Sequence, residues 1–276
     1  MSKLRRAPPA FVRSADGVRI AYESVGGGSP ALVLVHGWSC DRCYWDGQLA
    51  RLSRDFEVVT IDLAGHGDSD LHRQAWTIQS FGDDVASVVN CLALDDVVLV
   101  GHSMGGDVIL AAATKLRGRV RGLVWVDTYG QLPQQRTHDQ VRERMTPFRA
   151  DFVESTRAFV RALFGVSSDP LLVERVARDM SAAPVAVALA TMEAAWSFAV
   201  NVPALLAELR LPLVAINPDN ADTDVESLRR FEIEVALLPR VGHFPMLEDP
   251  QAFNDQLVKA VTAISADPKR ATGGAG

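Results

Sequence analysis

The stretch Val98–Gly106, which reads VLVGHSMGG, contains a G-x-S-x-G motif centred on Ser103. A short apolar run precedes the motif, and the segment Asp107–Ala113 that follows it has the composition of a helix. This succession of strand, turn and helix is the setting of a nucleophile elbow, in which a serine hydroxyl stands above the edge of a sheet. Gly101 and Gly105 fit this interpretation, because a side chain on either flank would clash where strand and helix approach closely. Ser103 is therefore the predicted nucleophile.

The composition is typical of one large globular unit. The 276 residues are 48% hydrophobic, which is enough to bury a sizeable core. The formal net charge of −6 does not indicate binding to nucleic acid or to an anionic membrane. No run reaches the roughly 18 apolar residues of a membrane helix, and the basic N-terminus lacks the apolar segment of a signal peptide. We expect a cytoplasmic protein without a nucleic-acid or membrane partner, and the sequence leaves its oligomeric state open.

The cysteines and the glycine-rich loops indicate neither a metal nor a cofactor. An odd, small number of cysteines, Cys40, Cys43 and Cys91, fits reduced thiols better than a disulfide framework. Cys40 and Cys43 have C-x-x-C spacing, but no second pair or Cys/His cluster completes a metal site. The sequence also lacks the phosphate-binding G-x-x-x-x-G-K-[ST] motif.

Short apolar runs recur along the chain and predict the strands of a buried parallel sheet. An N-terminal hairpin comes first, with Asp16-Gly17 at its turn. The later runs do not alternate with polar residues, which is typical of strands covered by helices on both faces. They are Ala31–Val35, Val58–Ile61, Val97–Val100, Leu123–Val126, Leu213–Ile216 and Val235–Leu238. Segments with helical spacing separate them, so the sequence predicts an α/β fold.

One interval interrupts the alternation of strands and helices. Residues 130–209 contain amphipathic helical pieces and no strand-like run, which predicts an all-helical cap. The cap would be inserted into one core domain, formed by residues 1–129 and 210–266, and a flexible tail would follow at 267–276. A few apolar cap residues are expected to line a cavity beneath it. Arginines in this interval follow no single helix face and are expected at the solvated surface: Arg136, Arg142, Arg144, Arg149, Arg157 and Arg161.

A serine hydroxyl needs a base to accept its proton, and His243 is the predicted base. His243 follows the last strand run and precedes the last helix, so it should stand at the same sheet edge as Ser103. The other histidines are expected to shape loops, to point away from the serine or to be solvated: His36, His66, His72, His102 and His138.

The oxyanion of the transition state needs two backbone N–H donors. The amide of Met104 should supply one, because it follows the nucleophile at the N-terminus of a helix, where unpaired amides and the helix dipole favour negative charge. The loop His36–Trp38, after the run Ala31–Val35, should supply the other through the amide of Trp38.

Together these motifs resemble the α/β-hydrolase superfamily along nearly the whole chain. The matching segments are His36–Trp38, Asp62–Ser69, Gly101–Gly106 and Gly242–Phe244. The resemblance implies an eight-stranded, mostly parallel sheet with an all-helical cap inserted after strand six. Within the superfamily the chain is similar to the small esterases, lactonases and cofactor-free haloperoxidases.

Several aspartates are candidates for the acid that orients the histidine. Family members usually place it in a Gly-x-x-Asp context after strand seven, where this chain reads Asn217–Asp224 and lacks the glycine. We predict Asp219, because it follows the strand closely. Asp222 in the same loop is an alternative, and so is Asp127 at the end of strand six, a position that some family members use.

The expected function is that of a serine hydrolase that cleaves carboxylic esters of small to medium apolar substrates through an acyl-enzyme. A serine at the elbow excludes the epoxide hydrolases and haloalkane dehalogenases of this fold, which use aspartate there. A lactonase, a C–C bond hydrolase or a perhydrolase with the same triad is the alternative within the enzymes. A ligand receptor that retains the fold is the alternative from another class.

Overall fold

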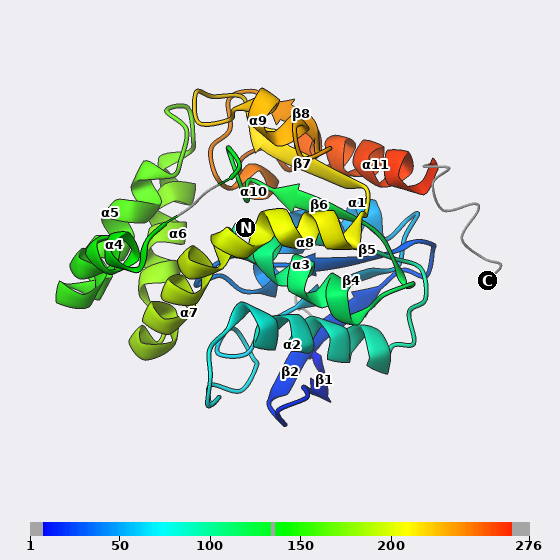
Figure 1. Ribbon diagram of the computed structural model, residues 1–276, viewed down its shortest axis with the longest axis horizontal. Helices are drawn as coiled ribbons and strands as arrows, with labels where there is room; N and C mark the ends of the chain where they lie inside the picture. Colours follow the sequence, from blue (N-terminus) through cyan, green and yellow to red (C-terminus); the bar gives the residue numbers. More distant parts are fainter. Residues whose placement is uncertain (1–7, 134–135, 267–276) are drawn as a thin grey trace.

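The computed structural model describes residues 8–133 and 136–266 of the chain. Within these residues an eight-stranded sheet forms the centre of the molecule, with the order β1-β2-β4-β3-β5-β6-β7-β8 (Figure 1). In this sheet β2 runs antiparallel to β1 and β4, and all other neighbouring strands run parallel. The predicted eight-stranded, mostly parallel sheet is thus confirmed. The strands are β1 Ala10–Arg13, β2 Arg19–Val25, β3 Ala31–Val35, β4 Val58–Ile61, β5 Val97–His102, β6 Val120–Val126, β7 Leu213–Pro218 and β8 Glu234–Leu238.

The centre of the sheet is buried on both faces. Every residue of β3, β4 and β5 is buried, and most are β-branched side chains that pack well on a pleated surface. The edge strand β8 is partly exposed, because it has a strand neighbour on one side only. The predicted hairpin joins β1 and β2, and Gly17 at its turn has a φ of 87°.

Helices cover both faces of the sheet (Figure 1). One layer contains α2 (Ile78–Cys91), α3 (Met104–Lys115) and α8 (Val202–Leu209), with α3 packed between the other two. The opposite layer contains α1 (Asp46–Leu52) and α11 (Pro250–Ala266), which contact each other. The short helices η1 (Arg42–Trp45), α9 (Val225–Arg229) and α10 (Pro245–Glu248) lie in the connections of the core. Because β3 to β8 run parallel, their C-terminal ends lie at one edge of the sheet, which we call the open edge.

The segment between β6 and β7 is helical, and most of it lies beyond this open edge (Figure 1). Its helices are α4 (His138–Ala150), α5 (Phe152–Ala162), α6 (Pro170–Ser181), α7 (Val185–Phe198) and η2 (Ala199–Asn201), followed by α8. The last helix, α8, packs on α3 in the core layer, although it falls within the interval 130–209 that the sequence assigns to a cap. The predicted tail, 267–276, lies outside the described residues.

The structure contains one helical run that is longer and more apolar than the sequence analysis expected. Val185–Leu209 forms a 25-residue helical run that is long and apolar enough to cross a membrane by length and composition. Within the protein this run is α7, η2 and α8, of which α7 and α8 contact α3, and 44% of its most apolar window is buried. Core helices of soluble proteins pass the same test, so the run is weak evidence for a membrane span.

The turn between β5 and α3 brings a strand and a helix into close contact. Ser103 lies at this turn with φ 51° and ψ −121°, a conformation that residues other than glycine rarely adopt. A Cβ atom on Gly101 would overlap with the carbonyl group of Gly105. A Cβ atom on Gly105 would lie 2.5 Å from the carbonyl oxygen of Val35 in β3. The glycines on both sides of Ser103 are therefore required by close backbone approach.

We expect Gly101→Ala to lower the free energy of unfolding by about 1–3 kcal/mol, because α3 must move away from β5 to admit the methyl group. Urea denaturation followed by circular dichroism measures the change. Gly27→Ala is the matched control: no atom lies within 4 Å of a Cβ at Gly27, so its effect should stay within about 0.5 kcal/mol. Equal stability of the two variants would contradict the packing argument.

Candidate active site

The imidazole of His243 is paired with the carboxylate of Asp127. The Nδ1 atom of His243 lies 2.6 Å from Oδ2 of Asp127, and the two side chains are only 17% and 19% exposed. Asp127 directly follows β6 with a φ of 44°, and His243 lies in the loop between β8 and α10. A carboxylate on Nδ1 fixes the orientation and the tautomer of the ring, which leaves Nε2 available to a nucleophile.

The predicted acid, Asp219, is not the residue that contacts the histidine. Its backbone amide donates to the carbonyl of Leu238 at the end of β8, and its side chain is exposed, as is that of Asp222. The physical reason is the local backbone. The turn after β6, in which Asp127 has a φ of 44°, brings its carboxylate to Nδ1 of His243, whereas the amide of Asp219 is bonded at the end of β8 and its side chain is exposed. Asp127, the alternative from the sequence, is the residue that the structure pairs with His243.

The backbone around His243 is held from three separate parts of the chain. Its N–H donates to the carbonyl of Leu163 at 2.9 Å, and its carbonyl accepts from Nε2 of His102 at 2.8 Å. The amides on either side of it donate to the carboxylate of Glu248 at 2.9–3.1 Å. The sequence analysis did not identify these contacts. An acidic residue in the first turn of a helix, such as Glu248, was the available signal, whereas a backbone carbonyl such as that of Leu163 leaves none.

The two residues whose amides the sequence analysis assigned to the oxyanion, Met104 and Trp38, both lie near Ser103. Met104 is the first residue of α3, and the first N–H groups of a helix have no partner within it. The loop after β3 passes close by, since a Cβ atom on Gly37 would lie 3.2 Å from Cβ of Ser103. Trp38, the next residue of that loop, lines the same cavity as Ser103 and Met104.

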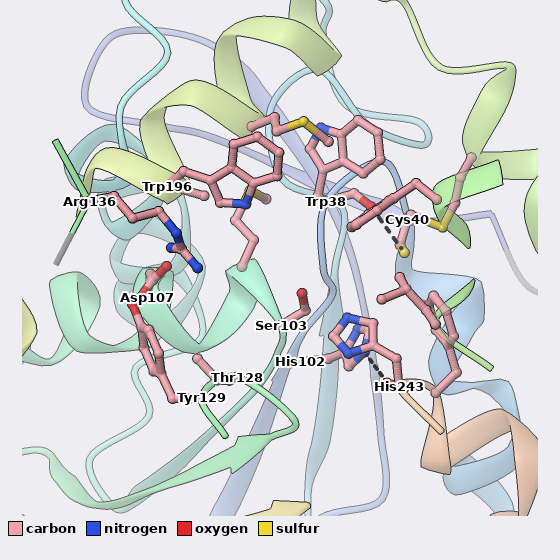
Figure 2. A pocket seen from close by; sticks show the side chains of 17 residues that line it. Trp38, Cys40, His102, Ser103, Asp107, Thr128, Tyr129, Arg136, Trp196 and His243 are labelled. Atoms are coloured by element: carbon pink, nitrogen blue, oxygen red, sulfur yellow. Dashed lines mark hydrogen bonds between the residues drawn. The ribbon is translucent and has the colours of Figure 1, made fainter. Parts of the chain in front are cut away.

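A cavity of about 180 Å³ opens above Ser103 and also exposes the ring of His243 (Figure 2). Its apolar lining includes Trp38, Phe159, Leu163, Met180, Met192 and Trp196. The Trp38 ring meets three phenylalanine rings edge-on, with centroids 6.0–6.2 Å apart, and its indole N–H donates to the carbonyl of Ala188 at 2.7 Å. Trp38 therefore ties the loop after β3 to the helices that follow β6.

The cavity has a polar end formed by Asp107, Tyr129 and Arg136. The hydroxyl of Tyr129 donates to Oδ1 of Asp107 at 2.6 Å. Burial raises the pKa of Asp107 to about 7, although the Tyr129 hydrogen bond and the charge of Arg136 act in the opposite direction. Burial also lowers the pKa of the Arg136 guanidinium. Arg136 is half-buried and its side chain lines the cavity, so the expectation that it belongs to the solvated surface is wrong (Figure 2).

The two cysteines of the C-x-x-C spacing lie in different surroundings. Cys40 is buried beside the cavity, where its thiol donates to the carbonyl of Trp38 at 3.3 Å, and burial raises its pKa well above the usual value. Cys43, the second residue of the C-x-x-C spacing, is exposed, and neither cysteine forms a disulfide. Within residues 8–133 and 136–266 no group of three or more His, Cys, Asp or Glu side chains is placed to hold a metal ion.

Comparison with known proteins shows similarity to hydrolases. The chain is 38% identical over 118 residues to a non-heme haloperoxidase of Rhodococcus erythropolis, which covers 42% of this chain and 43% of that protein. It is 32% identical over 101 residues to the 2-(acetamidomethylene)succinate hydrolase of Mesorhizobium japonicum, covering 37% and 36%. An uncharacterized protein of Mycobacterium tuberculosis is 34% identical over 125 residues, covering 45% and 36%. The match thus spans less than half the length of each of these relatives.

Solved structures share the fold over nearly the whole chain. An esterase from Thermogutta terrifontis superimposes with a TM-score of 0.80 at 22% identity and covers 94% of this chain and 99% of its own. A bromoperoxidase from Bacillus anthracis gives a TM-score of 0.78 at 21% identity, covering 92% and 99%. The model of the alpha/beta hydrolase family matches residues 32–256, which include the Ser103 turn and the His243–Asp127 pair. This chain belongs to the alpha/beta hydrolase family.

Proposed function

We propose that the protein is a serine hydrolase that cleaves carboxylic esters of small to medium apolar substrates through an acyl-enzyme. The observation that supports this most strongly is the 2.6 Å pairing of His243 with Asp127 at a cavity that Ser103 also lines. A histidine oriented in this way is the general base that a serine hydroxyl requires. Membership of a hydrolase family supports the same chemistry.

In the proposed acylation step, Oγ of Ser103 attacks the ester carbonyl carbon while Nε2 of His243 takes its proton. Asp127 keeps the other proton on Nδ1 and stabilises the imidazolium that forms. The amides of Met104 and Trp38 donate to the tetrahedral oxyanion, where preorganised N–H groups stabilise the charge that develops. Collapse of this intermediate expels the alcohol, which receives its proton from His243.

In the proposed deacylation step, a water molecule attacks the acyl-serine, and His243 acts as base for it in the same way. The acid product leaves and Ser103 is regenerated, so these steps need no cofactor. The helices α4 to α7 would act as the cap, since apolar side chains of α5, α6 and α7 contribute to the cavity wall and would exclude water around the bound ester. The proposed location is the cytoplasm, where an odd, small number of cysteines would stay reduced.

Perhydrolysis is the second candidate, favoured by the similarity to a non-heme haloperoxidase. Hydrogen peroxide would take the place of water in deacylation and yield a peracid. Lactone and C–C substrates would use the same triad and would differ only in what the cavity binds. Assays of peracid formation and of lactone opening beside ester hydrolysis separate these activities.

We expect Ser103→Ala to lower kcat for p-nitrophenyl butyrate by at least about 10⁴-fold, because nothing else at the elbow forms the acyl-enzyme. Labelling by a fluorophosphonate probe should disappear in the same variant. Ser87→Ala is the control, since this hydroxyl donates to the backbone carbonyl of Asp83 within α2, away from the cavity. Undiminished turnover by the Ser103→Ala protein, with its circular dichroism spectrum intact, would falsify the proposal.

We expect Asp127→Asn to lower kcat for the same ester by about 10³–10⁴-fold, because an amide in place of the carboxylate favours the wrong imidazole tautomer. Asp219→Asn removes one negative charge at the exposed position and should retain the wild-type rate. Steady-state kinetics of both variants at about pH 8, well above the ordinary histidine pKa, measure the difference. The reverse ranking would identify Asp219 as the acid.

A further inference from the structure

The polar end of the cavity contains ionisable groups that ester hydrolysis does not require. Asp107 lies on α3, Tyr129 follows β6, and Arg136 precedes α4, so the three come from different elements. In Figure 2 they lie on one side of Ser103, whereas Trp38 and Cys40 lie on the other. The proposed reaction uses groups beside Ser103 and His243 and gives these three side chains no role.

The pair of Asp107 and Tyr129 is a built feature rather than a surface contact. Asp107 is only 5% exposed and Tyr129 only 4%. Burying a carboxyl and a phenol is costly unless they are hydrogen-bonded, and here the hydroxyl of Tyr129 donates to one carboxyl oxygen. Asp107 itself lines the cavity. Because the pKa of Asp107 is raised to about 7, a large share of this carboxyl is neutral near neutrality.

Arg136 gives this end of the cavity a positive charge. Its guanidinium remains protonated in proteins, and its planar donors match the two oxygens of a carboxylate. Trp196, another cavity residue, has the guanidinium of Arg144 over its ring at 4.9 Å, which places a second positive charge nearby. When Asp107 is protonated and neutral, Arg136 contributes a positive charge to this end of the cavity.

We propose that this end of the cavity binds a carboxylate of the substrate through Arg136, so that the preferred esters are half-esters of dicarboxylic acids or other esters with one remote carboxylate. The proposal rests on the proposed function and names its substrate class. Tyr129 and protonated Asp107 would border the bound carboxylate with hydroxyl groups. The apolar end, around Trp38 and Phe159, would take the uncharged part of the ester.

The test compares two esters of equal chain length, mono-p-nitrophenyl adipate and p-nitrophenyl hexanoate, at low salt and about pH 7, near the pKa of Asp107. The wild type should show a kcat/KM for the adipate at least about tenfold higher, mainly through KM, since an arginine–carboxylate hydrogen bond has that magnitude. A second pair, 4-acetoxybenzoate and 4-acetoxybenzamide, places the carboxylate on the alcohol side. Preference for the carboxylate in either pair supports the proposal, and preference in neither pair overturns it.

Variants assign the preference to its residue. In Arg136→Gln the ratio of the two kcat/KM values should fall by about tenfold or more, and Arg136→Lys should retain part of it. Arg142→Gln is the matched control, because it removes the same charge from the neighbouring helix at a side chain that is 70% exposed. A loss in Arg136→Gln that is equal for the charged and the neutral ester would show a structural role and overturn the proposal.

Binding to Ser103→Ala keeps the two proposals distinguishable. Trp38 and Trp196 line the cavity, so quenching of tryptophan fluorescence reports the binding of monomethyl adipate and of methyl hexanoate. The adipate should bind about tenfold more tightly, and the Ser103→Ala, Arg136→Gln double variant should lose this preference. Selective binding without any ester turnover by the wild type would reject the hydrolase and retain the carboxylate site. Turnover of hexanoate without selectivity in either assay would reject the carboxylate site alone.

Discussion

The close contact between β5 and α3 is the constraint on which the rest of the structure depends. Ser103 has a positive φ at the junction, and the glycines on either side have no room for a side chain. A residue in such a conformation persists only where its surroundings hold it there. Here the buried strands and the packed helix do so. The same contact places the serine at the first turn of α3, where unpaired amides and the helix dipole meet the developing negative charge in the proposed reaction.

The histidine depends on a different principle, because no regular element positions it. His243 lies in a loop whose amides and carbonyl bond to Glu248, His102 and Leu163, and whose ring bonds to Asp127. Each such bond contributes about 1 kcal/mol, so the loop is held by their sum. Leu163 follows α5, so this bond joins the loop of His243 to the helical segment between β6 and β7. A rearrangement of that segment would therefore change the position of the His243 loop as well as the shape of the cavity.

The cavity combines parts of the chain with different chemistry. Its apolar side is organised by Trp38, which packs against rings of α4 and α5 and bonds to α7. Its polar side joins the buried Asp107–Tyr129 pair to the guanidinium of Arg136. The family fold places Ser103 at the edge of the sheet, whereas the helices after β6 and the loops that meet them shape the cavity. In the proposed reaction, the fit of the substrate would depend on packing between elements and the chemical step on one edge of the sheet.

The sequence by itself determined the α/β fold, the strands and the positions of Ser103 and His243 in their loops. It did so because apolar runs, glycines at a tight turn and short motifs are local patterns that determine the backbone structure of the same segment. Only the tertiary structure decided which aspartate meets the histidine, since Asp127 and Asp219 both follow strands. The choice is made by a long-range contact, since His243 and Asp127 lie 116 residues apart in the sequence. The tertiary structure likewise decided that Arg136 faces the cavity, because a charged side chain near a helix start looks the same in sequence whether solvent or another element covers it.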